Sequence, residues 1–389
     1  MRICVVSQQL KNVYSGVGLH TKLLVDDLIS KGHDLTVIVP EKEKPIIQAP
    51  YKIITIPSPR FINSQARWLE LSPKFSKILH SLEKKSGFDL VHFTDFRDSL
   101  FCRTTSPMIA NVNDTYTAEL KSLSYYREHY FDWFQRFIYY RAAHFFESRR
   151  LLELDAVITN SQFTYKTIKK AYGVEDKRLF KCYKAVNYSR YAELAKDRLS
   201  QPKLNHGNRI LFVGGNMQRK GVLDLIRSAP VIQRAIPDVR FMIAGKDKYI
   251  TKYKQLCKEL GVSQNFIFLG WVSQEDLLYL YKSASCFIMP SLTEALGVVF
   301  LEAMSAAIPV IGTDVGGISE IIKDSNNGLL VPVNDPLAIA EAAIKILTDE
   351  DFSKRLVING IETVKQFSVE KMMACVEDIY RSVLKSKFK

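Results

Sequence analysis

The sequence predicts an α/β protein with two domains, each a doubly wound parallel sheet. Short apolar runs typical of buried strands lead into glycine-rich turns and then helices, and this unit recurs along the chain. A length of 389 residues is enough for two domains with separate hydrophobic cores. A composition of 47% hydrophobic and 24% charged residues is ordinary for a globular protein. The repeated strand, turn and helix are therefore the main evidence for the fold class.

In the first half of the chain, a glycine turn and a helix follow the first strand. The turn covers residues 14–18, and the helix runs over about residues 19–31 and ends at Gly32. The turn lacks the G-x-G-x-x-G spacing, and no acidic residue follows at the usual distance, so we expect no dinucleotide site. The predicted strands are Arg2–Ser7, Leu35–Val39, Phe88–Phe93, Met108–Val112, Ala156–Ser161 and Phe180–Val186.

A polar segment at Ala195–Asn208, which contains proline and glycine, predicts the linker to the second half. Within that half, Ser273 with Asp276 three residues later predicts the start of a helix. A last helix is expected over about Val369–Lys385. The predicted strands are Arg209–Val213, Val239–Ala244, Phe266–Leu269, Cys286–Pro290 and Leu329–Val331. A further strand is predicted to begin at Val310 and to open into a glycine-rich turn within residues 310–317.

The cysteine and acidic patterns do not indicate a metal centre. Asp349 and Asp351 form the single D-x-D, at a charged helix boundary where solvated side chains are expected. No apolar run approaches the roughly 20 residues that a membrane span needs, and the first residues enter a strand without a signal-peptide pattern. We expect a cytoplasmic protein with reduced, structural thiols, because its six cysteines are scattered without C-x-x-C spacing. They are Cys4, Cys102, Cys182, Cys257, Cys286 and Cys375.

The positive charge is concentrated in the first half of the chain. Of a formal net charge of +13, residues 1–200 contribute +10, from 31 lysines and arginines against 21 aspartates and glutamates. An anionic membrane, a phosphorylated acceptor and a nucleic acid are each compatible with such a surface.

Residues 294–302, EALGVVFLE, predict an anion site between two carboxylates. A loop that turns at Gly297 into a helix leaves backbone N–H groups unpaired, with the positive end of the helix dipole behind them. Glu294 and Glu302 flank this site, and carboxylates accept hydrogen bonds from sugar hydroxyls. A diphosphate with hydroxyl groups on both sides, as in a nucleotide-sugar, fits this pattern. The alternative is that the two glutamates only complement the helix dipole.

Residues 290–322, PSLTEALGVVFLEAMSAAIPVIGTDVGGISEII, resemble the signature of the retaining glycosyltransferases of family 4. Members of that family have the GT-B fold, with two Rossmann-like domains and a cleft between them. The resemblance implies that Glu294 contacts the donor sugar and that Glu302 contacts the ribose. It also implies that the intervening loop contacts the diphosphate through Ala295, Leu296, Gly297 and Val298.

A second phosphate-binding segment is implied at residues 214–221, GGNMQRKG. Glycines and cations at a helix entrance suit a diphosphate. By resemblance Lys220 binds the phosphate, and Gly214 and Gly215 lie in the same loop. The family usually has an arginine where this chain has Gly215, and Arg219 is the candidate substitute.

The resemblance also implies further donor contacts. Gly16, together with Gly18, would cover the diphosphate from the first domain, with a simple tight turn as the alternative. Lys246, Trp271 and Val272 would surround the base, with buried packing as the alternative for Trp271.

Acceptor-side candidates follow two predicted strands of the first domain. His92 and the pair Asn113 and Asp114 lie where a cleft is expected in an open parallel sheet. The alternative for His92 is a satisfied histidine at the end of a strand. The family usually has histidine at the position of Asn113, and an amide cannot take up a proton. Residues 184–187, KAVN, stand where the family usually has N-G-V-D.

Aromatic residues and arginines interleave through residues 125–150. Such a helix could lie at a membrane interface, with rings at headgroup level and arginines on phosphates. The alternative is a core helix packed on the sheet.

Together with these patterns, the resemblance implies a GT-B protein with domains at residues 1–198 plus 368–389 and at residues 199–367. The expected function is retaining, metal-independent transfer of a sugar, of the hexosyl type, from a nucleoside-diphosphate sugar to a glycan or lipid-linked saccharide. No cofactor and no nucleic-acid partner are expected, and the inner face of the membrane is a candidate location. The alternatives are a catalytically inactive GT-B regulatory subunit and a membrane-interface binding protein.

Overall fold

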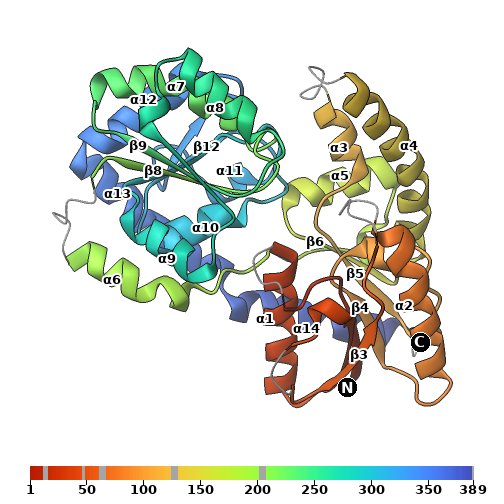
Figure 1. Ribbon diagram of the computed structural model, residues 1–389. Coiled ribbons are helices and arrows are strands. Elements are labelled where there is room, and N and C mark those ends of the chain that lie inside the picture. Colours follow the sequence, from red (N-terminus) through yellow and green to blue (C-terminus); the bar gives the residue numbers. More distant parts are fainter. Residues whose placement is uncertain (12–15, 46–48, 61–66, 124–129, 201–206, 388–389) are drawn as a thin grey trace. The chain divides into compact units, whose positions relative to one another are not determined.

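A computed structural model describes residues 1–11, 16–45, 49–60, 67–123, 130–200 and 207–387 (Figure 1). The chain forms two compact units, Met1–Ala185 with Val369–Lys389 and Val186–Ser368. The division thus lies at residues 185 and 186, whereas the sequence suggested 198 and 199. Residues 188–200 belong to the second unit because Arg190 donates to the backbone of Gln274 and Arg198 to that of Tyr281.

Unit 1 contains a sheet of seven parallel strands in the order β3-β2-β1-β4-β5-β6-β7. Its strands are β1 Arg2–Val6, β2 Asp34–Pro40, β3 Lys52–Ile56, β4 Leu90–Phe93, β5 Met108–Val112, β6 Ala156–Thr159 and β7 Leu179–Lys181. Its helices are α1 Gly16–Ser30, α2 Trp68–Glu83, α3 Tyr116–Ser122, α4 Tyr130–Glu153, α5 Gln162–Tyr172 and α14 Val369–Lys387.

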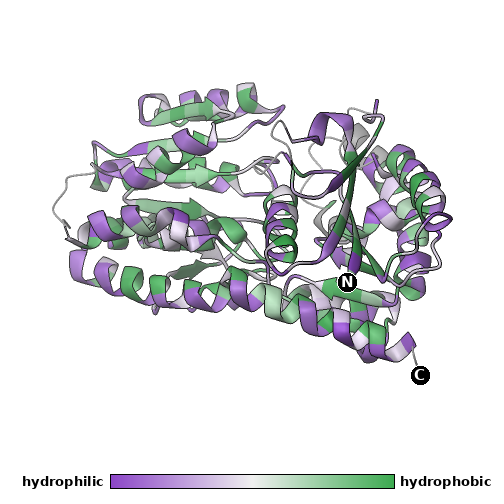
Figure 2. Cartoon of the chain, turned by 90° about the horizontal axis from the view of Figure 1, so that it is seen from below, coloured by the Kyte–Doolittle hydropathy of each residue, from purple (hydrophilic) through white to green (hydrophobic). Residues whose placement is uncertain are grey.

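The central strands of unit 1 are buried on both faces because consecutive side chains point to opposite sides of the sheet. Cys4 and Val6 of β1 join a core that includes residues of α2, α3, α4 and α5. Ile3 and Val5 join a second core with α1 and α14. Strand residues are accordingly coloured mainly as hydrophobic in Figure 2, while the helices show both classes.

Helix α14 is anchored to the centre of the unit 1 sheet by a buried histidine. His92 on β4 is fully buried, and its Nε2–H donates to the side-chain oxygen of Asn111. Because this fixes the proton on Nε2, Nδ1 accepts the hydrogen bond from the Tyr380 hydroxyl of α14, at 2.5 Å. Burial lowers the pKa of His92 to about 4, against the weaker effect of Asn111.

Unit 2 contains a sheet of six parallel strands in the order β10-β9-β8-β11-β12-β13. Its strands are β8 Arg209–Val213, β9 Arg240–Ala244, β10 Phe266–Gly270, β11 Cys286–Met289, β12 Val310–Thr313 and β13 Leu329–Val331. Its helices are α6 Ala192–Ser200, α7 Val222–Ala235, α8 Ile250–Glu259, α9 Gln274–Ser283, α10 Val298–Ser305, α11 Ile318–Ile321, α12 Pro336–Thr348 and α13 Glu350–Val364. Helices α7 and α12 lie on one side of this sheet, and α9 and α10 lie on the other (Figure 1).

Several predicted local features match the structure. The bounds of β5, β8 and β13 are those predicted, and Ser273 forms a reciprocal capping box with Asp276 at the start of α9. Asp349 caps α13 by accepting from the backbone N–H of Phe352. The six cysteines are free thiols.

Four local predictions were wrong. The strand predicted over Phe180–Val186 is β7, which ends at Lys181. Helix α1 begins at Gly16, within the predicted turn, because glycine can start a helix when it is exposed. The predicted linker contains the end of α6, and residues 201–206 lie outside the described part of the chain. Strand β3 was missed because it is an edge strand whose residues are mostly half-buried, which weakens its apolar pattern.

Acidification should destabilise unit 1 through His92. Between about pH 6.5 and pH 4 the unfolded chain protonates this histidine while the folded chain does not, so the free energy of unfolding falls as pH decreases. His92 is expected to lower the free energy of unfolding by about 3 kcal/mol at pH 4 relative to pH 7. His20, whose pKa burial also lowers, acts in the same direction.

Urea unfolding of the wild type and of His92→Gln at several pH values tests this. We expect the variant to lose part of the pH dependence, whereas the exposed control His80→Gln retains it. Parallel pH curves for the wild type and His92→Gln would contradict the prediction.

Candidate functional site

The first part of the candidate site is the connection between β11 and α10 in unit 2. Gly297 has a φ of 91° and stands directly before the helix, where its left-handed backbone turns the loop into α10. Glu294 lies in this loop, and its side chain is only 12% exposed. Leu296 is buried, while Ala295 and Val298 are half-buried. The chain therefore presents Glu294 and the first turn of α10 from one rigid corner.

The second part is the glycine turn after β12, which packs backbone to backbone against the Glu294 loop. Gly316 has a φ of 59°, and a Cβ atom there would overlap the carbonyl oxygen of Glu294. The backbone N–H of Gly317 donates to that same oxygen at 3.0 Å. A Cβ atom at Gly317 would overlap the carbonyl of Ala295. Sequence reasoning noted this turn but did not assign these two glycines to the site, although adjacent glycines after a strand were the available signal.

The third part is the loop between β8 and α7, which carries the two cations. Gly221 has a φ of 79°, and a Cβ atom there would overlap the carbonyl oxygen of Pro290. The carbonyl of Arg219 accepts from the backbone N–H of Leu292 at 2.8 Å. Close backbone contact therefore joins this loop to the loop that carries Glu294.

Lys220, Arg219 and Glu294 meet at this junction. Lys220 Nζ forms an ion pair and hydrogen bond with Glu294 Oε2. Arg219 Nη1 donates to the carbonyl oxygen of Thr293 at 2.9 Å and lies 3.9 Å from Glu294 Oε2. Two cations thus lie beside one carboxylate.

Burial and ion pairing act in opposite directions on these groups. Burial favours the neutral form of Glu294, but Lys220 and Arg219 outweigh it and hold the pKa of Glu294 below its ordinary value. Burial lowers the pKa of Lys220, and Glu294 opposes this. The carboxylate of Glu294 therefore stays ionised at neutral pH.

Glu302 lies in the second turn of α10 and has a different environment. Burial raises its pKa, while the hydroxyl of Tyr281 from α9, which donates to Glu302 Oε2 at 2.9 Å, opposes the effect. Tyr281 is fully buried and therefore fixes the orientation of this carboxyl group. The two glutamates are thus held by separate partners, one by cations and one by a phenol.

The ends of β8, β9 and β10 also lie close together. A Cβ atom at Gly245 would overlap the carbonyl oxygen of Gly214, and the backbone N–H of Gly245 donates to Gly270 at 2.7 Å. Gly215 and Lys246 are exposed in these loops.

The side chains proposed for the base pocket lie at the same edge of the sheet. Trp271 is 52% exposed directly after β10, and Val272 beside it is half-buried. Buried packing is therefore ruled out as the explanation for Trp271.

In unit 1 the structure separates the predicted glycines. Gly16 is exposed at the first position of α1, and its carbonyl accepts from Lys184 Nζ at 3.3 Å. Gly18 is buried in the first turn of the same helix, so it is not part of a loop that could cover a ligand.

The acceptor-side candidates are also separated. His92 is in the core, as described above, so the alternative of a satisfied histidine fits the structure and a surface role does not. Asn113 follows β5 and its amide donates to the carbonyl of Thr94 at 3.2 Å. Asp114 pairs with Arg97 Nη1 at 2.7 Å. Arg97, which sequence reasoning missed, lies over the ring of Tyr116 at 4.5 Å.

Comparisons with known proteins agree with this architecture. Residues 14–190 match the family described as Glycosyltransferase Family 4, and residues 195–363 match Glycosyl transferases group 1. The uncharacterized glycosyltransferase MJ1607 of Methanocaldococcus jannaschii is 27% identical over 98% of both chains.

Two solved structures show the same fold over nearly the whole chain. Sucrose-phosphate synthase from Thermosynechococcus elongatus superposes with a TM-score of 0.82 at 21% identity, covering 99% of this chain and 100% of that one. Anabaena HepE, solved with UDP and glucose, superposes with a TM-score of 0.72 at 17% identity, covering 98% and 100%. The chain belongs to the family 4, group 1 glycosyltransferases and has the GT-B fold.

Proposed function

We propose that this glycosyltransferase moves a sugar from a nucleoside-diphosphate sugar to a hydroxyl group, with retention of anomeric configuration and without a metal ion. The observation that carries the proposal is the junction of Lys220, Arg219 and Glu294 at the ends of neighbouring strands. The solved HepE complex, which contains UDP and glucose, supports a nucleotide-sugar as the donor class.

Lys220 and Arg219 would stabilise the departing diphosphate. When the bond between the anomeric carbon and the phosphate oxygen breaks, its electron pair moves to that oxygen and negative charge develops there. Cations already fixed at the site stabilise this charge without reorganisation. The backbone N–H groups of Leu296, Gly297 and Val298 at the start of α10 would add to this effect. Because the protein supplies the charge, the proposed reaction needs no metal.

The two glutamates would orient opposite ends of the donor. Glu294 keeps an ionised carboxylate, which can accept hydrogen bonds from sugar hydroxyls. Glu302, held by Tyr281, would bind the ribose, and Lys246, Trp271 and Val272 would surround the base. Gly214 and Gly215 would allow the diphosphate to approach the backbone, because they carry no side chain.

The acceptor oxygen would attack the anomeric carbon on the face that the diphosphate leaves, which preserves the configuration. Its proton would pass to the leaving phosphate oxygen, so no side-chain base is required. This route suits a chain with Asn113 at the position where its family usually has histidine. We propose a saccharide or lipid-linked saccharide as the acceptor, with the sugar transferred to it at the inner face of the membrane. Asn113 and Asp114 are the unit 1 candidates for contacts with the acceptor, and Gly16 is the unit 1 candidate for a contact with the donor diphosphate.

Removing either member of the central pair should abolish transfer while the fold persists. We expect Lys220→Met and Glu294→Gln each to lower the transfer rate by about a hundredfold or more, because a fixed stabilising charge or a sugar contact is lost. Lys354→Met and Glu350→Gln, at an exposed ion pair of α13, are matched controls and should leave the rate unchanged. Near-normal turnover of either site variant would refute the assignment, and the absence of donor hydrolysis and transfer by the wild type would indicate an inactive protein.

The glycine turn after β12 should be essential for the position of Glu294. Gly316→Ala adds a Cβ atom where the Glu294 carbonyl lies, so we expect it to destabilise unit 2 and to weaken donor binding. Gly261→Ala is the matched control, because Gly261 also has a positive φ but has open space around its Cβ position. Urea unfolding should show a cost for Gly316→Ala that exceeds the control by at least about 2 kcal/mol. Equal costs for the two variants would mean that the two loops are not in contact.

The donor class can be identified by thermal unfolding. A ligand that binds only the folded chain raises its melting temperature by mass action, so one of the UDP-, GDP- and ADP-sugars should stabilise the protein more than the others. The stabilisation should be smaller in Lys220→Met. If none of these donors changes the melting temperature, the nucleotide-sugar proposal fails.

A further inference from the structure

The outward face of α4 in unit 1 carries apolar side chains where an exposed helix normally carries polar ones. Phe145 is 66% exposed, Ile138 is 53% exposed and Leu152 is 46% exposed. Their spacing follows the helical repeat, so they lie along one stripe. We call this stripe the α4 outer face, and its exposed large apolar residues are Phe134, Phe137, Ile138, Phe145, Phe146 and Leu152.

The opposite side of α4 is ordinary core. Tyr140, Ala143 and Leu151 are buried in one of the two cores of unit 1. The sequence left a membrane-interface helix and a core helix as alternatives, and α4 combines features of both. Residues 125–129, which the same prediction included, lie outside the described part of the chain.

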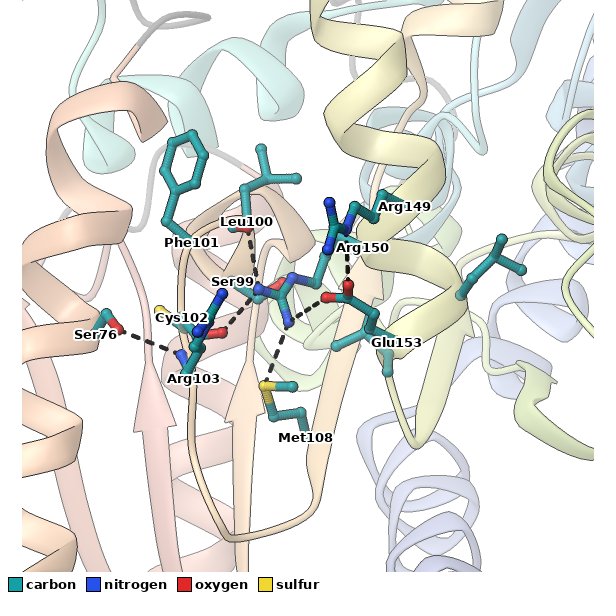
Figure 3. Close-up of polar contacts among 12 residues, drawn as sticks. Ser76, Ser99, Leu100, Phe101, Cys102, Arg103, Met108, Arg149, Arg150 and Glu153 are labelled. Atoms are coloured by element: carbon teal, nitrogen blue, oxygen red, sulfur yellow. Dashed lines mark hydrogen bonds and ion pairs between the residues drawn. The ribbon is translucent and has the colours of Figure 1, made fainter.

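The neighbouring loop extends the α4 outer face and is held rigidly. The exposed ring of Phe101 contacts the edge of the Phe146 ring at 5.7 Å between centroids. The buried Arg150 of α4 donates to the carbonyls of Leu100 and Cys102 at 3.1 and 2.7 Å, as Figure 3 shows. The aromatic surface is therefore already formed in the free protein and needs no partner to assemble it.

Arginines accompany the apolar side chains. Arg103 and Arg141 are exposed, and the side chain of Arg149 is 73% exposed. Among the described side chains of α4, Glu153 is the exposed carboxylate, and it pairs with Arg149 at 3.1 Å. Unit 1 has 33 lysines and arginines against 22 aspartates and glutamates, a net charge of +11, whereas unit 2 has 21 against 19.

We propose that the α4 outer face, together with Phe101 and Arg103, is a docking surface for an anionic phospholipid bilayer. Aromatic and aliphatic side chains enter the headgroup region while arginines bind lipid phosphates. The stripe from Phe134 to Leu152 is about 27 Å long, which suits a helix lying in the plane of a membrane. Among the described residues, no helix combines the length and the apolar character that crossing a bilayer requires.

Charge favours a bilayer over a second copy of this chain. In a symmetric dimer the same patch appears on both sides, so Arg103, Arg141 and Arg149 of both copies would be brought into one interface. A lipid phosphate surface complements them instead. Docking would bring unit 1 to lipid-linked acceptors, but it does not depend on the proposed transferase reaction.

Co-sedimentation with vesicles tests the proposal on the full chain. One set of vesicles contains phosphatidylcholine alone, and the other contains about one third phosphatidylglycerol. We expect the wild type to bind the anionic vesicles, with binding that decreases as salt increases. Ile138→Ser/Phe145→Ser should weaken partitioning at least about tenfold. Arg141→Glu/Arg149→Glu should remove the preference for anionic lipid.

Matched controls use exposed residues of unit 2. Leu337→Ser/Ile358→Ser and Arg234→Glu/Arg355→Glu make the same chemical changes there and should bind as the wild type does. Lys220→Met should also bind normally, and Ile138→Ser/Phe145→Ser should retain transfer to a soluble acceptor. Vesicle binding therefore reports on docking alone, and transfer to a soluble acceptor reports on the proposed reaction alone.

Two results would overturn the proposal. One is that the wild type stays in the supernatant with both kinds of vesicle. If the wild type is then also a dimer that Ile138→Ser/Phe145→Ser converts to a monomer, the α4 outer face is a dimer interface instead. The other is equal loss of binding in the α4 variants and in their unit 2 controls.

Discussion

The ion pair between Lys220 and Glu294 is the interaction on which the candidate site depends. Each side chain is largely buried, and an isolated charge in that position would cost several kcal/mol. Pairing offsets much of this cost, and Arg219 adds a second cation to a single carboxylate. Two cations therefore lie beside Glu294, which stays ionised and able to accept hydrogen bonds.

Glycines make this arrangement possible because the three loops approach one another through their backbones. A side chain at Gly221 would overlap Pro290, and side chains at Gly316 and Gly317 would overlap the Glu294 loop. The parallel sheet brings the ends of β8, β11 and β12 together, since these strands are neighbours. The glycines then close the remaining distance, so the positions of Lys220 and Glu294 follow from topology and backbone shape.

The sequence predicted the architecture well because strands buried on both faces give unmistakable apolar runs. It failed where packing between distant segments decides the outcome. His92 lies near the end of β4, which suggested a position in a cleft, but Tyr380, 288 residues later, covers it from α14. Gly18 follows a turn-like sequence, yet it is part of α1.

The glycine pair after β12 shows a third limit. Two adjacent glycines after a strand indicate a tight turn, but the segment that the turn contacts lies more than 20 residues earlier in the chain, so the sequence alone did not identify this contact. The motif around Glu294 was recognisable in the sequence. The glycine turn that positions Glu294 could be identified only from the folded structure.

For the α4 outer face the sequence pattern was visible, but its meaning was ambiguous. Its mixed composition of aromatic residues and arginines is consistent both with a membrane-interface helix and with a core helix. Only the burial of individual side chains shows that the core face and the exposed apolar stripe coexist. A surface can thus be flagged by composition, but its use depends on which side chains the fold leaves exposed.

The central claim is that Lys220 and Glu294 form part of a binding site for the diphosphate, and calorimetry can test it directly. The affinity of a nucleoside diphosphate and of its parent nucleoside would be measured for the wild type and for Lys220→Met. The account predicts that the variant binds the diphosphate at least about tenfold more weakly while nucleoside affinity is unchanged. Unchanged diphosphate affinity, or an equal loss for both ligands, would contradict it.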